Sequence, residues 1–136
     1  MRNGFGFSVL VFAAIAAIAA TAPALAHHSA AALYDVNETI EIEGRLIAFF
    51  FRSPHSEAIV EAPDADGEMQ RWTVAWNAAR QLSQAGITRD FFRPGEQLVI
   101  TGNPGRNPDD HIIVMRSLYR PSDGFEWGNR PGETFD

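Results

Sequence analysis

The sequence predicts a small, mostly β domain that follows a cleaved signal peptide. Three observations support this prediction. The first segment is apolar and unlike the rest of the chain, short runs further on alternate apolar with polar residues, and turn residues separate those runs. The chain has 136 residues, which is enough for one domain.

Residues 1–26 have the three parts of a secretory signal peptide. Arg2 gives a positive start, Val9 to Ala20 is an unbroken apolar run, and Ala24-Leu25-Ala26 supplies small residues for cleavage. The apolar run is shorter than the roughly 20 residues that a membrane span needs. We therefore expect cleavage after Ala26, no stable membrane anchor afterwards, and a periplasmic or secreted mature protein. An uncleaved anchor is the alternative.

The composition of the mature chain excludes several classes of function. Without Arg2, ten arginines and no lysines face 17 acidic residues, and the net charge with neutral histidines is −7. An acidic domain repels phosphate groups, which argues against nucleic acid and anionic membrane surfaces as partners. The chain has no cysteine, so disulfides and thiol chemistry are excluded.

The first three predicted strands are Thr39–Arg52, Ser56–Ala62 and Met69–Trp76. Gly44 interrupts the first strand, which indicates a bulge or a sharp bend. This strand ends in three consecutive phenylalanines, and at least one of them must face outward in a regular strand. The turn cluster 63–67 predicts a hairpin between the second and third strands.

The periodicity changes after the third strand. Residues Ala78–Ala85 are good helix formers, and Asn77 is a candidate N-cap. Gln97–Thr101 and His111–Arg120 are the fourth and fifth predicted strands. A loop rich in Gly, Pro and Asn is expected between them at 102–110, beginning with a tight turn.

The resulting order, β-β-β-α-β-β, is that of the five-stranded Greek-key barrel called the OB-fold. We therefore predict an OB-like β-barrel over residues 39–120, preceded by an N-terminal arm at 27–38 and followed by a polar tail at 121–136. A bent first strand suits this barrel because that strand serves both of its halves. Another small barrel, or a roll with one helix, has the same order of elements.

Several short strings occur together in the mature chain: His27-His28-Ser29, Pro54-His55, Trp72, Leu82 with Gly86, Arg89-Asp90, Pro94-Gly95 and Gly102-Asn103-Pro104-Gly105-Arg106. With them, the chain resembles domain of unknown function 6152, a family of short exported bacterial proteins. The resemblance implies export and a shared fold, and it implies no activity. Phe51, Ser53 and Ala75 stand where the family pattern has Trp, Asn and Glu, and Glu96 stands where it has Asp.

The histidines of the mature chain suggest a metal site. Cleavage after Ala26 makes His27 the terminal residue, so its α-amine and imidazole can chelate one ion together. Nitrogen ligands in a tetragonal arrangement favour Cu(II), with Zn(II) or Ni(II) behind. His28 or His55 would supply a third nitrogen. Cleavage after Ala24 would instead place His27 third, which makes a different, square-planar copper or nickel site.

Other residues have both a functional and a structural interpretation. The histidines near the new N-terminus can also be a solvated tip, and His111 after Asp109-Asp110 is either a second ion site or part of a polar loop rim. Trp72 and Trp76 share one strand face, so they either pack in the core or line a ligand-binding groove. The second interpretation makes the protein an adaptor for an envelope protein or ligand.

No catalytic signature is present in the sequence. The serines lie in no nucleophile elbow, and the glycine-rich string at 102–106 is not followed by the Lys-Ser or Lys-Thr of a phosphate loop. The sequence therefore favours a binding protein over an enzyme.

Overall fold

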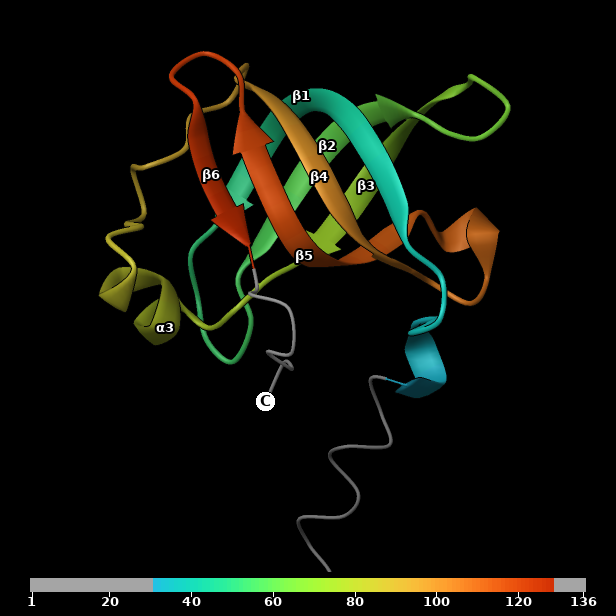
Figure 1. Cartoon of the computed structure of the whole chain (residues 1–136), viewed down its shortest axis with the longest axis horizontal. Helices are drawn as coiled ribbons and strands as arrows, with labels where there is room; N and C mark the ends of the chain where they lie inside the picture. Colours follow the sequence, from blue (N-terminus) through green and yellow to red (C-terminus); the bar gives the residue numbers. More distant parts are fainter. Residues whose placement is uncertain (1–30, 129–136) are drawn as a thin grey trace, which may run out of the picture. The chain divides into compact units, whose positions relative to one another are not determined.

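The computed structural model describes residues 31–128, in which six strands form one sheet that curls into a barrel (Figure 1). The elements in chain order are β1 (Ile40–Phe50), β2 (Glu57–Pro63), β3 (Met69–Ala75), α3 (Ala79–Gln84), β4 (Gln97–Pro104), the 3₁₀ turn η1 (Pro108–Asp110), β5 (Ile112–Arg120) and β6 (Phe125–Gly128).

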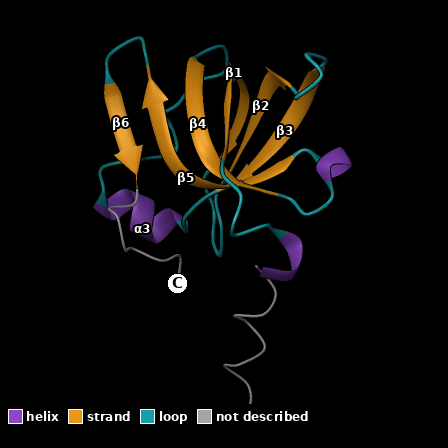
Figure 2. Ribbon diagram, turned by 45° about the vertical axis from the view of Figure 1, so that its right-hand side comes forward, coloured by secondary structure: helices purple, strands orange, loops and turns teal. Residues whose placement is uncertain are grey.

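The barrel closes where β3 meets β5. The sheet order is β3-β2-β1-β4-β5-β6, and β3 also pairs with β5 in parallel, from Thr73 opposite Ile112 to Ala75 opposite Val114. The other pairings are antiparallel. Five strands therefore form a closed ring with a short helix between β3 and β4, so the predicted OB-like barrel is confirmed. Figure 2 shows α3 at the lower end of the ring.

Strand β1 is shared by both halves of the barrel, as expected. Its first part, Ile40–Arg45, pairs with β4, and the part from Arg45 onward pairs with β2. A β-bulge lies between Leu46 and Ala48. Gly44 lies just before it, where β1 passes so close to β2 that a Cβ would be 2.3 Å from the carbonyl oxygen of Glu61. The glycine therefore permits the close approach of the two strands.

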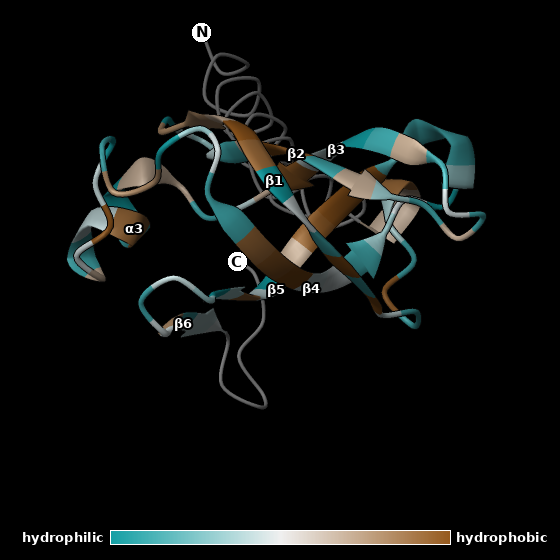
Figure 3. Ribbon diagram, turned by 90° about the horizontal axis from the view of Figure 1, so that it is seen from above, coloured by the Kyte–Doolittle hydropathy of each residue, from teal (hydrophilic) through white to brown (hydrophobic). Residues whose placement is uncertain are grey.

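Alternating residues of each strand fill the interior. Figure 3 shows hydrophobic stretches within the strands of the barrel. The buried apolar residues form one cluster: Ile42, Leu46, Ala58, Val60, Ala62, Trp72, Val74, Trp76, Leu82, Ile87, Phe92, Leu98, Ile100, Ile113, Met115 and Leu118. Of the three consecutive phenylalanines, Phe49 and Phe51 pack against this cluster, while Phe50 faces outward and is 46% exposed.

The structure differs from the prediction between 102 and 128. Strand β4 continues to Pro104 where a tight turn was expected, because Asn103 is buried and hydrogen-bonded. Its amide donates to the carbonyl of Glu38, and its oxygen accepts from Arg116 Nε at 2.7 Å. In addition, β6 lies within the segment that was expected to be a polar tail. The helix is capped at Ala78, one residue after the predicted position.

Candidate functional site

His55 lies in the loop between β1 and β2 and is exposed. The loop around it is fixed, because the buried Ser56 accepts a hydrogen bond from the backbone N–H of Arg52 (3.2 Å) and donates one to its carbonyl (3.1 Å). The backbone N–H of Trp76 also donates to the Ser56 carbonyl at 2.8 Å. His27 and His28 lie outside the described residues. His55 is therefore presented to solvent by a rigid loop.

The chain enters the barrel beside the end of β4. Tyr34 forms an isolated bridge with Gly105, and Asp35 N–H donates to the Pro104 carbonyl at 2.9 Å. Burial raises the pKa of the Tyr34 hydroxyl, and the carboxylate of Glu57 raises it further. Both effects favour the protonated hydroxyl.

Trp72 and Trp76 do not form a groove. Their exposed fractions are 8% and 1%, and both rings belong to the core. Trp72 Nε1 donates to the carbonyl of Ala62 at 3.3 Å, while Trp76 packs against Phe49 (5.8 Å between ring centroids) and Trp127 (5.0 Å). The shared face that the sequence predicted is real. It points into the barrel because this face of β3 completes the core.

His111 lies beside a carboxylate that the sequence did not single out. Its Nε2 lies 3.8 Å from Asp64 Oδ2, and its ring meets the ring of Trp72 edge-on, 5.1 Å away. Its backbone is in the left-handed region with φ of 46°. A hydrogen bond from the Gln70 amide lowers the pKa of Asp64, and backbone N–H donors and His111 lower it further. The pair links the β2–β3 hairpin to the start of β5.

A groove lies between the end of β1 and the segment that leads into β4. Its volume is about 520 Å³, and its lining residues are Ile47, Ala48, Phe49, Arg89, Asp90, Phe92, Arg93 and Pro94. Neither Arg89 nor Arg93 was predicted from the sequence to be a site residue. The one sequence feature that pointed to this segment is that Arg89-Asp90 and Pro94-Gly95 belong to the strings of the family resemblance.

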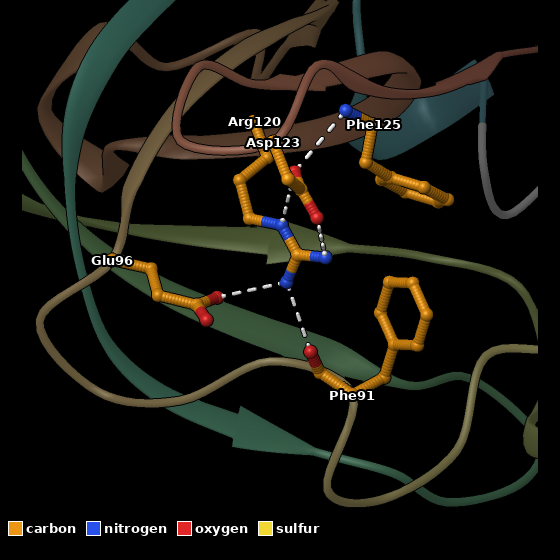
Figure 4. A network of polar contacts seen from close by, with 5 residues as sticks. All are labelled: Phe91, Glu96, Arg120, Asp123 and Phe125. Atoms are coloured by element: carbon orange, nitrogen blue, oxygen red, sulfur yellow. Dashed lines mark hydrogen bonds and ion pairs between the residues drawn. The ribbon is translucent and has the colours of Figure 1, made fainter.

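Arg120 is the most deeply buried charged group of the described chain, and it has a structural role (Figure 4). Its guanidinium donates to Asp123 (2.8 and 3.0 Å), to the Phe91 carbonyl (2.9 Å) and to Glu96 (3.2 Å). The Asp123 carboxylate raises the pKa of Arg120, and Glu96 raises it further. With its donors occupied, Arg120 fastens the turn before β6 to the segment before β4.

Within residues 31–128, no three or more His, Asp or Glu side chains gather in a way that would hold a metal ion. No helix in this part of the chain has the length and apolar character needed to cross a membrane.

Together, the fold and the surface features define a small OB-like β-barrel with one exposed loop histidine and one shallow groove. Residues 14–113 match the family of unknown function DUF6152, and the chain belongs to that family. No curated protein and no solved structure shows significant similarity to the chain.

Proposed function

We propose that the protein is exported and that its mature form binds Cu(II) through its N-terminal histidine, as a binding protein and not an enzyme. The observation that carries this proposal is the position of His27 directly after the predicted signal peptide. Cleavage after Ala26 frees an α-amine beside an imidazole. The pKa of an α-amine is about 8, so a useful fraction is neutral and able to bind metal at pH 7.

His28 or His55 supplies the third nitrogen in this proposal. His55 suits that role because it is exposed and its ring makes no hydrogen bond or ion pair with a described residue. Tyr34 is fixed on the barrel and follows His27 by seven residues. Seven extended residues span at most roughly 23 Å, so this ligand set requires His55 to lie within that distance of Tyr34.

The donor set determines the metal. An amine and two or three imidazoles are nitrogen ligands of intermediate softness, and they suit the tetragonal geometry that Cu(II) prefers. The absence of cysteine argues against a Cu(I) thiolate site. The proposed site combines His27 with His28 or His55, since no three or more His, Asp or Glu side chains within residues 31–128 gather in a way that would hold a metal ion.

Native mass spectrometry of protein purified from the periplasm tests the proposal. We expect a chain that begins at His27 and carries one Cu(II). One extra residue before His27 should weaken Cu(II) binding at least about tenfold, because it moves the α-amine away from the imidazole. His55→Ala should weaken it less. His111→Gln is the matched control and should leave it unchanged, because His111 lies beside Asp64 and Trp72 and is not a ligand in this proposal.

Equal Cu(II) affinity in the extended protein would eliminate the terminal chelate. A mature chain that begins at Leu25 would also overturn it, since His27 would then stand third. The alternative function, an adaptor that binds an envelope protein or ligand, would use the rings of Phe49–Phe51 or those of Trp72 and Trp76. Both tryptophans lie in the core, so Phe50, which is 46% exposed, is the ring left to such a contact.

A further inference from the structure

The groove between β1 and the segment before β4 has the size of a small-molecule site. Its volume of about 520 Å³ lies within the range of roughly 300–1,000 Å³ that such sites occupy. Part of its lining is apolar, with Ile47 and Phe49 from β1 and with Phe92 and Pro94 from the segment before β4. An apolar group placed against these side chains would be partly removed from water.

The walls of the groove are fixed by hydrogen bonds. Leu46 N–H donates to the Glu96 carbonyl and Gly95 N–H donates to the Leu46 carbonyl, both at 2.8 Å. The β-bulge between Leu46 and Ala48 lies at the same place, next to Ile47. Below, the rings of Phe49 and Phe92 meet edge-on at 5.5 Å. A ligand would therefore meet a preformed surface and would spend little free energy on ordering it.

Arg89 and Arg93 give the groove its positive charge. Both are exposed, and neither makes an ion pair or a side-chain hydrogen bond with any residue of the described range. In contrast, Arg45, Arg52 and Arg120 each pair with a carboxylate. Arg80 is also exposed and without an ion pair among the described residues, but it does not line the groove as Arg89 and Arg93 do.

We propose that this groove binds a small monocarboxylate with an apolar body. A planar guanidinium pairs with a carboxylate through two parallel hydrogen bonds, and the apolar wall takes the rest of the molecule. Asp90 also lines the groove and repels a second negative charge, which favours a monoanion over a phosphate dianion. The chain as a whole carries −6, so the attraction is local to the two arginines.

A titration followed by ¹⁵N-resolved NMR tests the proposal on protein purified after expression of the full chain. The probe is 4-phenylbutyrate, and its neutral amide and inorganic phosphate are the comparison ligands. We expect the carboxylate to shift the amide resonances of 47–49 and 89–93, and the other two compounds to bind at least about tenfold more weakly. Arg89→Gln and Arg93→Gln should each weaken carboxylate binding about tenfold.

Arg80→Gln is the matched control, because Arg80 is an exposed arginine on α3 that does not line the groove. It should leave the affinity for phenylbutyrate unchanged. Equal binding of the amide, tighter binding of phosphate, or an equal loss in Arg80→Gln would each overturn the proposal. So would resonance shifts that follow protein concentration alone, since these would identify a second copy as the occupant. Removal of His27 does not enter this test, so its outcome is separate from that for copper.

Discussion

Arg120 illustrates how one side chain can stabilise several distant segments. Arg120 is 7% exposed, and its guanidinium lies over three aromatic rings, those of Phe91, Phe92 and Phe125. Burying a charge is costly unless hydrogen bonds and counter-charges compensate for the lost hydration. Here Asp123 and Glu96 supply both. The aromatic end of the barrel is therefore organised around a cation that remains charged.

Replacing Arg120 with methionine should lower the free energy of unfolding by roughly 3 kcal/mol, because the Glu96 carboxylate and the Phe91 carbonyl lose their donor. Urea unfolding measures the change. Arg45→Met is the matched control, since Arg45 also pairs with a glutamate but its side chain is 54% exposed. Its urea midpoint should change little. Equal losses in the two variants would contradict the structural role of Arg120.

The sequence predicted the chemical properties of single residues better than it predicted which other residues they contact in space. Alternation correctly placed Trp72 and Trp76 on one face, but alternation alone does not say whether that face is inside the barrel. The pairing of His111 with Asp64 joins residues 47 positions apart, so no local pattern could reveal it. Arg89 and Arg93 line a groove together with Ile47 and Ala48, residues about 40 positions earlier in the chain, so a local pattern could not reveal it.

Among the elements, β1 depends most on a single glycine. A methyl group on Gly44 would meet the Glu61 carbonyl at 2.3 Å and Ala62 Cβ at 2.6 Å, both on β2. Gly44→Ala should therefore cost about 3 kcal/mol of stability by forcing the strands apart. Gly67→Ala, at an open turn position with φ of +84°, should cost only about 1 kcal/mol. Thermal unfolding measures the loss of stability in both variants. A smaller loss in Gly44→Ala than in Gly67→Ala would contradict the close approach of β1 and β2.

Strand β6 was missed because its pattern is short. Four residues, Phe125–Gly128, give only one full alternation, and the turn residues before them predicted a loop. Its folding depends on contacts that are distant in the sequence. Trp127 covers Trp76, and Phe125 packs on Phe91 at 4.9 Å. The other strand boundaries agreed with prediction to within about three residues, since their alternation continues over a longer stretch.

Trp127→Ala should expose the ring of Trp76 to water. We expect a red shift in tryptophan emission and a loss of about 2 kcal/mol in stability, because Trp127 is only partly buried. The Phe50→Ala variant removes an aromatic ring that is already exposed and should leave the emission unchanged. An unshifted emission spectrum in Trp127→Ala would show that β6 does not cover the core.

For the molecule as a whole, the order of elements was enough to predict the barrel. The sequence contains no signal for the register of its closure, because β3 and β5 meet at the ends of a long connection and pair over only three residues. That register follows from packing the interior, where Val74 and Ile113 lie opposite each other and are both fully buried. Such a fit is a property of the complete core.

The stability of the whole domain should fall in acid. Hydrogen bonds from Gln70 and Arg120 lower the pKa of Asp64 and Asp123, respectively, from their usual value of 3.8. When folding lowers the pKa of a carboxyl group, that group stabilises the native state. The stabilisation is complete at pH values above the pKa of the unfolded state, and it is lost as the pH falls through the pKa of the folded state. Urea midpoints should therefore be constant near neutrality and drop below about pH 4.

Asp64→Asn should make that drop smaller, because one of the two carboxyls no longer titrates. Urea midpoints of the native protein and of Asp64→Asn, each measured at pH 6 and at pH 3, test this prediction. If the native protein has the same midpoint at both values, these carboxylates do not contribute to acid sensitivity.

The anchoring of Tyr34 against Gly105 has a consequence for the end of β4. Strand β1 pairs with β4 only as far as Ile40 opposite Gly102, while β5 continues along the other side to Ile113 opposite Pro104. Tyr34 and Asp35 take over from β1 at Gly105 and Pro104, where the Asp35 N–H donates to the Pro104 carbonyl at 2.9 Å. The segment before β1 therefore covers what would otherwise be an open strand edge, the kind of edge on which another chain can add a strand.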